Sequence, residues 1–376
     1  MEKVKISNND QIIMSLVHYF VTKENYSPIV VKGAKDEVWL ENLNAKYKVI
    51  RINNNYIHNE EQYQFDLGKF NHVLSQIKRK TFSFKIYALN ICLDSADRVE
   101  IGEYNTITSI SIKKISDLKK NSIINTIFPK ISMDIIEKTE NLEDIKNVTS
   151  DINAVTMGRN VKLQELFAPK SNLMTYIIMA ICILMFVITI LTNFNLLYWG
   201  ANFGEEVKNG GYYRLITSIF LHANFIHLFV NMYSLNILGK ELENIVGRYK
   251  FIYIFMLSGL CGSLLSILIN GNATFSVGAS GAIFGLGSAL IYFGYQYRLY
   301  LNKMLYSQLI PVLGINIIIG FMLTGIDNAA HIGGLIGGYL AASFVGIDKE
   351  VNKKERTNGF IATIVFLIFC FYLISR

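Results

Sequence analysis

Residues 172–192 read NLMTYIIMAICILMFVITILT, a stretch without one charged side chain. A helix crosses about 30 Å of hydrocarbon with about 20 such residues, so this stretch predicts a transmembrane helix. Similar apolar stretches follow at 215–238, 251–270, 279–297, 305–323, 329–346 and 359–375. We therefore predict a polytopic all-α membrane domain with seven spans. The boundaries of 215–238 stay open, because this stretch contains His222, His227 and Asn231.

The N-terminal part of the chain has a different composition. Of all 376 residues 51% are hydrophobic and 17% are charged, against about 25% charged in an ordinary soluble protein. The charges gather in 1–170, and the composition changes near Pro169 and Lys170. We therefore predict a soluble domain over 1–165. Helical spacing at 9–22 and 60–79 and strand-like stretches at 27–33, 46–52 and 81–93 predict a mixed α/β fold for it.

Charge and cysteine content argue against several kinds of site. The formal net charge is +7, but the basic residues form no continuous patch, so we expect a membrane and no nucleic acid as partner. The four cysteines lie far apart, which argues against a disulfide framework or a metal site. No cofactor is implied. The first residues lack the apolar core of a secretory signal, so the soluble domain is expected in the cytoplasm.

Lys and Arg in the short loops predict the orientation, because cytoplasmic loops carry an excess of both. One set of loops holds Lys240, Arg248, Lys250, Arg298, Lys303, Lys349, Lys353, Lys354 and Arg356. The opposite set holds only Lys208, Arg214 and Arg376. We therefore expect the first set on the cytoplasmic side, together with the soluble domain, and the C-terminus on the outer side.

Three clusters of polar residues interrupt the apolar spans, at 214–231, 278–285 and 328–338. Polar side chains are costly inside a bilayer and need partners or a water-filled cavity. Each cluster also has a plain structural interpretation. A single histidine can be a packing residue, and GxxxG spacings are typical of close helix contacts.

Ser280 and His331 are predicted to meet. The fourth and sixth spans run in the same direction, and each of the two residues lies near the outer end of its own span. Gly281, Gly334 and Gly338 would let the two helices approach closely. A serine needs a base within about 2.6–3.2 Å to lose its proton. The pair is therefore a candidate nucleophile and base.

The second span offers donors for a developing oxyanion. His227 and Asn231 lie four residues apart and share one face of a helix. If Asn224 caps that helix, both lie in its first two turns, level with Ser280; if the helix starts at Leu215, both lie too deep. The catalytic hypothesis thus predicts the later start and a long outer loop before it. The backbone N–H of Ser280 would be a third donor.

These residues resemble the rhomboid protease family. Five patterns of that family occur in its order: its outer-loop arginine at Arg214, HxxxxHxxxN at 222–231, GxxxExxxG at 239–247, GxSG at 278–281 and AHxxGxxxG at 330–338. The resemblance covers about 171–376. It implies a six-helix rhomboid core over 171–347, followed by an additional transmembrane helix at 359–375.

The resemblance also implies roles for single residues. Ser280 would be the nucleophile and His331 the base of a dyad without a catalytic acid, so Asp327 is given no catalytic role. His227 and Asn231 would be oxyanion donors. The remaining residues would support the site or the fold: His222, Gly278, Gly281, Arg214 and Glu243, with Phe284 stacked on the histidine where some relatives have tyrosine.

A serine endopeptidase is the activity that this resemblance implies. It would hydrolyse peptide bonds at or near transmembrane segments of membrane proteins, with transmembrane substrates and the lipid bilayer as partners. The soluble domain and the extra helix resemble the Gram-positive bacterial subgroup of GluP type, which implies a bacterial plasma membrane and a site toward the outer face. Recruitment or regulation stays open as the role of the soluble domain.

Other classes of function remain as alternatives. A catalytically silent rhomboid-like protein would bind transmembrane helices without cutting them, but its usual sign would be loss of Ser280 or His331, and both are present. A transporter would carry polar residues at mid-membrane and inverted repeats. Here the polar residues lie at outer span ends. The soluble domain could also carry a separate adapter activity.

Overall fold

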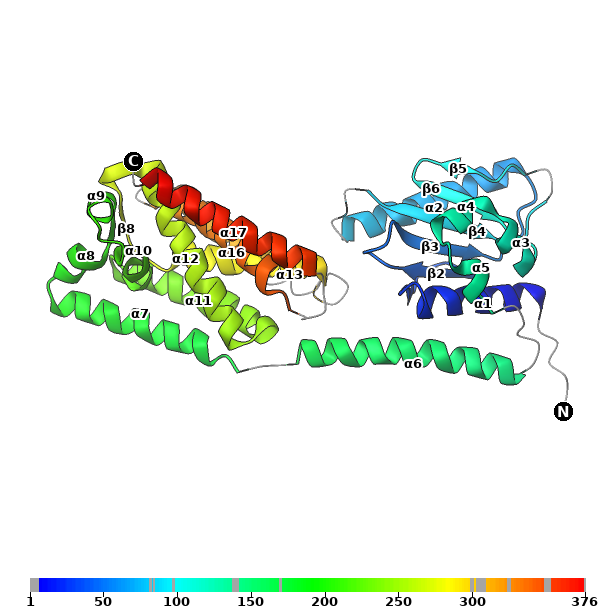
Figure 1. Cartoon of the computed structure of the whole chain (residues 1–376), viewed down its shortest axis with the longest axis horizontal. Helices are drawn as coiled ribbons and strands as arrows, with labels where there is room; N and C mark the ends of the chain where they lie inside the picture. The colour runs from blue at the N-terminus through cyan, green and yellow to red at the C-terminus, as the bar shows by residue number, and fades with distance from the viewer. Residues whose placement is uncertain are drawn as a thin grey trace. The chain divides into compact units, whose positions relative to one another are not determined.

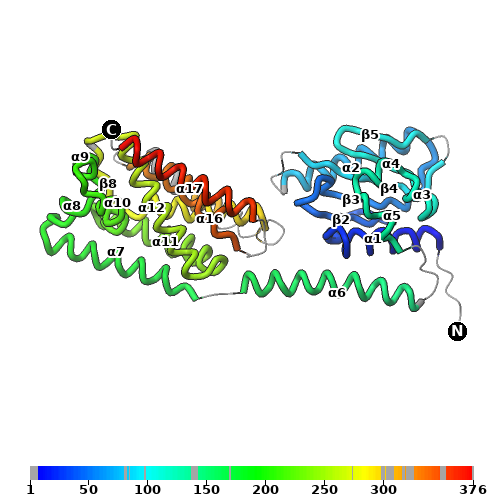
Figure 2. Tube along the Cα trace, in the orientation of Figure 1, coloured from blue at the N-terminus to red at the C-terminus, as the bar shows by residue number. Residues whose placement is uncertain are grey.

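The chain folds into two compact units, Met1–Leu163 and Gln164–Arg376. The computed structural model describes residues 7–80, 83, 85–96, 99–136, 142–168, 171–297, 301, 309–322, 326–347 and 353–374. The first unit is an α/β domain, and the second is an all-α membrane domain (Figures 1 and 2). Both parts of the predicted fold class are thereby confirmed.

A six-stranded mixed sheet forms the centre of the soluble unit. Its strands are β1 (Ser27–Ile29), β2 (Glu37–Glu41), β3 (Tyr47–Asn53), β4 (Tyr87–Cys92), β5 (Glu103–Tyr104) and β6 (Ile107–Ser111). Their order in the sheet is β1-β2-β3-β4-β6-β5. The β3–β4 and β4–β6 pairs are parallel, and the other pairs are antiparallel.

Helices cover both faces of this sheet. Successive side chains of a strand point to opposite faces. Accordingly Ile50 packs in one core cluster with α1 (Asn8–Thr22), and Val49 packs in another with α2 (Glu60–Lys80). The short helices α3 (Ile115–Lys120), α4 (Ser122–Ile127) and α5 (Ile131–Asp134) join the α1 cluster. Both predicted helices are thereby confirmed.

The strands were predicted less completely. The stretches at 27–33, 46–52 and 81–93 contain β1, β3 and β4, although β1 ends already at Ile29. The sequence analysis missed β2, β5 and β6. These strands have two to five residues, too few for a clear period of two, and they depend on pairing with distant neighbours.

The long helix α6 (Leu142–Leu166) is fastened to the end of α1. Arg159 donates hydrogen bonds to the backbone oxygens of Val21, at 2.6 Å, and Tyr26, at 2.9 Å. His18 on α1 lies 3.4 Å from Asp151 on α6. Arg159 therefore satisfies a carbonyl that the end of α1 leaves without a helical partner.

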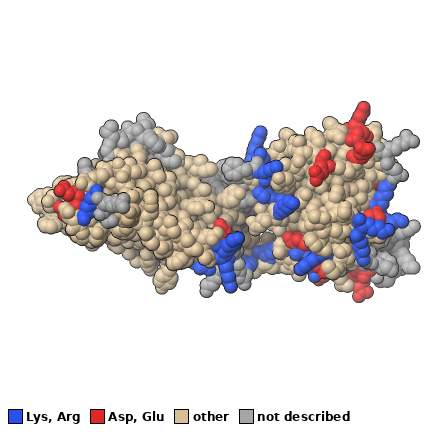
Figure 3. Space-filling view, turned by 45° about the horizontal axis from the view of Figure 1, so that its top comes forward, with Lys and Arg blue, Asp and Glu red and all other residues tan. Residues whose placement is uncertain are grey.

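The membrane unit consists of helices and a short two-stranded sheet. Its elements are α7 (Leu173–Leu191), α8 (Asn195–Gly200), β7 (Asn202–Phe203), α9 (Gly204–Lys208), α10 (Arg214–Thr217), η1 (Ser218–Phe220), α11 (Phe225–Val246), α12 (Arg248–Asn270), η2 (Gly271–Ala273), β8 (Phe275–Ser276), α13 (Ser280–Gln296), α15 (Ile310–Met322), α16 (Asn328–Val345) and α17 (Lys353–Ile374). On the face drawn in Figure 3, most of this unit carries no charged side chain.

Three helices of the described part are long and apolar enough to span a membrane by themselves: α7, α12 and α17. The segment of α10 and η1 meets the criterion only together with α11, and the two meet at an angle of 89°. The helices α13 and α16 are shorter, with 17 and 18 residues. Of the predicted span 305–323, residues 305–308 and 323 lie outside the described residues.

Glycine contacts bring α12, α13 and α16 together. A methyl group at Gly334 would run into the carbonyl oxygen of Gly281, and one at Gly338 into that of Gly285. At Gly285 an added methyl group would also meet the side chain of Ser258 on α12. These helices pack backbone against backbone, which is the use expected of GxxxG spacings in membranes.

Two buried charged residues fasten the ends of the bundle. Glu243 is fully buried and accepts hydrogen bonds from the backbone N–H groups of Met174 and Thr175, at 3.0 and 2.8 Å. It thus caps α7, whose first N–H groups have no helical partner. Arg214 donates to the carbonyl oxygens of Tyr198 and Ala201, at 2.7 and 3.2 Å. It therefore holds the loop between α7 and α11, which fits its predicted supporting role.

The last helix is part of the bundle. In Figures 1 and 2 α17, in red, lies alongside α16. Gly359 lets α17 approach Ser343 of α16 closely, and Cys370 and Ile374 join a buried cluster with Val207 of the outer loop. The end of α17 therefore supports the loop that precedes the second span.

Candidate active site

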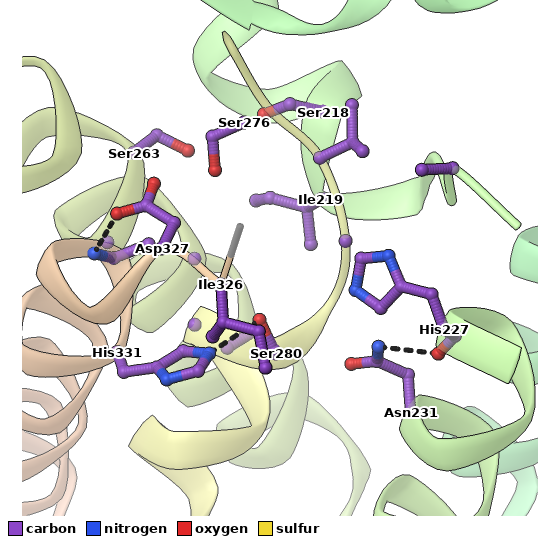
Figure 4. Close-up of a pocket in the computed structure, with 18 of the residues that line it drawn as sticks. Ser218, Ile219, His227, Asn231, Ser263, Ser276, Ser280, Ile326, Asp327 and His331 are labelled. Atoms are coloured by element: carbon purple, nitrogen blue, oxygen red, sulfur yellow. Dashed lines mark hydrogen bonds between the residues drawn. The ribbon is translucent and has the colours of Figure 1, made fainter. Parts of the chain in front are cut away.

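Ser280 and His331 lie at the starts of two packed helices. Ser280 is the first residue of α13, and His331 lies in the first turn of α16. The Nε2 atom of His331 is 3.0 Å from the Oγ atom of Ser280, which is a hydrogen bond (Figure 4). The structure thus brings together the two residues that the sequence analysis placed at the same depth.

Asp327 fixes the start of α16. Its carboxylate accepts a hydrogen bond of 3.0 Å from the backbone N–H of Ala330 and one of 3.1 Å from the Nδ2 atom of Asn270 on α12. It also accepts a short hydrogen bond from the hydroxyl of Ser266. Asp327 therefore caps the helix that carries His331 and ties it to α12. The sequence analysis did not foresee these bonds.

The imidazole of His331 is oriented by packing. The ring of Phe284, one turn after Ser280, is stacked on it with a centroid distance of 4.1 Å and an interplanar angle of 18°. Within the described ranges, Ser280 is the hydrogen-bond partner found for this ring, and no carboxylate bonds to it. The predicted stacking of Phe284 is confirmed.

The second span starts where the catalytic hypothesis requires. Asn224 caps α11, and its side-chain oxygen accepts a hydrogen bond of 2.8 Å from the backbone N–H of His227. His227 and Asn231 therefore lie in the first two turns of α11, and both line a cavity together with Ser280. The alternative start at Leu215 is wrong, because the chain turns by 89° between η1 and α11.

The side chain of Asn231 is hydrogen-bonded to its own helix. The Nδ2 atom of Asn231 donates a hydrogen bond of 2.8 Å to the carbonyl oxygen of His227. Figure 4 shows the amide oxygen of Asn231 on the side toward Ser280. Because the amide nitrogen carries two N–H groups, this bond engages one of the two donors of Asn231.

Gly278 lets the loop before Ser280 pass close to His227. Its φ is +121°, a conformation that side chains rarely adopt, and an added methyl group would lie 2.6 Å from the Nε2 atom of His227. The backbone N–H of Gly278 donates a hydrogen bond of 2.9 Å to the carbonyl oxygen of Ser218. Glycine is therefore required here for both backbone conformation and space.

His222 lies behind this group. Its side chain is fully buried, and its ring packs edge-on against the ring of His227 with a centroid distance of 5.2 Å. His222 thus contacts His227. The hydrogen bond of 3.0 Å is between Ser280 and His331 and does not involve His222. Gly281 acts at the helix contact, because an added methyl group would lie 3.1 Å from the carbonyl oxygen of Ala330.

A cavity of about 420 Å³ is lined by Ser280, His331, His227, Asn231 and Gly278. Polar groups from the loop before α11, from α11, α12 and α13 and from the start of α16 meet in it, among them Ser218, Asn224, Ser263, Ser276 and Asp327. The cavity offers a hydroxyl bonded to a base, nearby donors and room for a substrate group and water. This arrangement can perform acyl transfer.

Comparison with known proteins gives consistent matches. The Rhomboid domain matches residues 209–347. Rhomboid protease GluP of Bacillus subtilis is 25% identical over 340 residues, 85% of this chain and 66% of that protein. Putative rhomboid protease YdcA of the same organism is 34% identical over 161 residues, 42% of this chain and 75% of that protein.

A plant protein is similar over a shorter part of the chain. RHOMBOID-like protein 1 of Arabidopsis thaliana is 43% identical over 155 residues, 40% of this chain and 39% of that protein. The chain thus spans just under two thirds of GluP and less than half of the plant protein. With the Rhomboid domain in its membrane unit and a relative 34% identical of which it covers 75%, the chain belongs to the rhomboid family.

Proposed function

We propose that this chain is an intramembrane serine endopeptidase, which hydrolyses peptide bonds at or near transmembrane segments of membrane proteins. The observation that carries the proposal is the hydrogen bond of 3.0 Å between Ser280 and His331 inside a cavity with polar groups. Two relatives whose names describe them as rhomboid proteases, GluP and YdcA, support the same activity.

In the first half of the reaction, His331 acts as base. Its Nε2 atom takes the proton of Ser280 while the Oγ atom bonds to the scissile carbonyl carbon, and the carbonyl π electrons move to the oxygen. The ring of His227, an amide N–H of Asn231 and the backbone N–H of Ser280 would donate to this oxyanion. His331 then protonates the leaving amine, the C–N bond breaks, and an ester on Ser280 remains.

In the second half, water replaces the amine. His331 takes a proton from a water molecule, whose oxygen attacks the ester carbon, and the same donors stabilise the second oxyanion. The C–O bond to Ser280 breaks, and the proton on His331 returns to the serine oxygen. A base that both accepts and returns the proton needs a fixed ring, which the stack with Phe284 provides without a carboxylate.

The proposed setting follows from the charges of the loops. The soluble domain, 1–165, would lie in the cytoplasm of a bacterium, and the protease core, 171–347, would cross the plasma membrane with its site toward the outer face. The additional helix, 359–375, would then cross outward. Recruitment or regulation of substrates is the role proposed for the soluble domain.

The proposal is tested with a tagged single-span membrane substrate in proteoliposomes. The expected result is cleavage by the wild type, and background cleavage by Ser280→Ala and His331→Ala. Ser276→Ala is the matched control, because Ser276 lines the same cavity from β8. Equal cleavage by all four proteins would overturn the assignment of the dyad.

A silent helix-binding protein is the second candidate. The bond from Asn231 to its own helix favours it, because one N–H of this proposed donor is already engaged by the backbone. A fluorophosphonate, which reacts with activated serines, distinguishes the two. Labelling of Ser280 that His331→Ala abolishes supports the protease, whereas no labelling together with binding of transmembrane peptides supports the silent protein.

A further inference from the structure

A second cavity lies in the soluble unit, between α2 and the turn that joins β1 to β2. Its volume is about 420 Å³, equal to that of the active-site cavity. Sites for small molecules usually have about 300–1,000 Å³. Nothing in the proposed protease reaction uses this cavity.

A buried charged residue forms part of its lining. The side chain of Arg51 is 2% exposed and pairs with Glu37 and Asp66, each at 2.6 Å. Its guanidinium lies 5.6 Å from the ring centroid of Trp39 and 5.4 Å from that of Phe70. Buried ion pairs are a weak source of stability compared with apolar side chains of similar volume. The evident effect of this cluster is a rigid lining in which a cation and two aromatic rings keep one arrangement.

Glycines keep the cavity wide. Gly68 lies in the interior of α2, where glycine weakens a helix, and it lines the cavity. An added methyl group would meet nothing within 4 Å, so no packing contact requires glycine at this position. Gly33, in the turn on another wall, also faces open space. A larger side chain at Gly68 would therefore extend into the cavity.

The exposed residues of the lining attract anions. Lys32 and Lys69 are both exposed, and they line the cavity from the turn and from α2. The Nζ atom of Lys69 lies 4.5 Å from the ring centroid of Phe65, which keeps it on the helix surface. Behind them, the single charge of Arg51 already meets two carboxylates. Lys32 and Lys69 are therefore the cationic side chains of the lining that lie at the surface, beside Glu37 and His72.

We propose that this cavity binds a small organic anion with a flat apolar body. The body would lie between the wall of Gly33 and Ala34 and the wall of Gly68 and Val73. Its anionic group, a phosphate or a carboxylate, would lie against Lys32 and Lys69.

Ligand binding can be measured by the fluorescence emission of Trp39, which lines the cavity. The chain has two tryptophans, Trp39 and Trp199, so Trp199→Phe in the full-length protein leaves Trp39 as the single indole. Its emission is titrated with adenosine monophosphate and with benzoate, which carry a ring and either phosphate or carboxylate. Adenosine and inorganic phosphate are the partial probes. We expect a saturable change with at least one ring-bearing anion, and at least tenfold weaker binding of both partial probes.

Matched variants locate the binding. Gly68→Leu should abolish the saturable change without lowering the thermal unfolding temperature. Gly158→Leu is the control, because Gly158 is also a helix glycine with nothing within 4 Å, but on α6. Lys32→Gln with Lys69→Gln should weaken binding at least tenfold and remove its salt dependence.

Three results would overturn the proposal. These are no saturable change with either ring-bearing anion, unchanged binding by Gly68→Leu, and equal binding of inorganic phosphate alone. All are read from Trp39 and do not depend on proteolysis.

Discussion

Replacing Gly278 by alanine should inactivate the proposed protease through His227. Alanine at φ +121° is strained by about 1–3 kcal/mol. Its methyl group would lie 2.6 Å from the Nε2 atom of His227. Contacts between such atoms are favourable only at about 3.5–4.0 Å, so the imidazole must withdraw by about 1 Å.

The size of the effect follows from that displacement. An oxyanion donor must lie about 2.7–3.1 Å from the oxygen, and losing one donor lowers kcat about 10²–10³-fold. A shift of about 1 Å moves His227 out of this range. We therefore expect Gly278→Ala to lower kcat about 100-fold, as much as His227→Ala.

The control separates displacement of His227 from backbone strain. Gly271 also has a positive φ, +71°, but an added methyl group would meet nothing within 4 Å. Gly271→Ala should therefore lose stability in thermal unfolding yet keep its initial rate of substrate cleavage in proteoliposomes. The double variant Gly278→Ala/His227→Ala should cleave no more slowly than either single variant, because both remove the same donor.

Two outcomes would refute this reasoning. If Gly278→Ala and Gly271→Ala lost equal stability and equal activity, backbone strain alone would explain the effect. If the double variant multiplied the losses of the single variants, Gly278 would act on something other than His227.

Three further variants test other contacts. Asp327→Ala should lower stability by about 2–4 kcal/mol, because it removes a helix cap and leaves the buried hydroxyl of Ser266 without its acceptor. Thermal unfolding measures this loss. Compared with Asp327→Ala, Asp327→Asn should partly restore both stability and cleavage. Glu243→Ala should cost about 2–4 kcal/mol by uncapping α7, while fluorophosphonate labelling of the folded fraction stays unchanged. Phe284→Leu should lower kcat severalfold with little change in KM. The variant removes a ring contact that orients His331 and is worth about 0.5–1.5 kcal/mol. An unchanged kcat would contradict this role.

The proximity of Ser280 and His331 could be predicted, because the spans of a membrane protein fix the depth at which each residue lies. Helices that cross the same hydrocarbon layer place residues near corresponding ends at the same level. Span order and direction were therefore enough to pair two residues 51 positions apart. Predicting the depth of His227 also required the residue at which α11 starts. The side chain that caps this helix, Asn224, is visible in the sequence.

The contacts around the dyad could not be predicted in this way. The bonds of Asp327 to Ser266 and Asn270 depend on which residues of α12 face α16, and depth alone does not give the rotation of a helix. An Asp three residues before a helical N–H is a visible cap signal, so that half of its role could have been found. The approach of Gly278 to His227 depends on loop geometry, which no spacing rule gives.

In the soluble unit the missing information was long-range pairing. Arg51 reads as one more polar residue of a strand that alternates, and its partners Glu37 and Asp66 lie 14 and 15 residues away on other elements. Only the register that sets Trp39 opposite Arg51 brings the cluster together. Such pairings follow from the whole sheet, so local patterns predict the fold class but not the site.

Packing contacts explain how the proposed dyad would work without a catalytic acid. In a triad, a carboxylate bonded to the second ring nitrogen holds the histidine in place. Here that work falls to packing: α16 is fixed at its start by Asp327, and the ring lies flat against Phe284. Packing orients a ring only if the two helices cannot separate, and at Gly281 and Gly334 they meet backbone to backbone. The glycines of the family patterns are thus positioning residues, because a larger side chain at Gly334 would push α16 and its histidine away from Ser280.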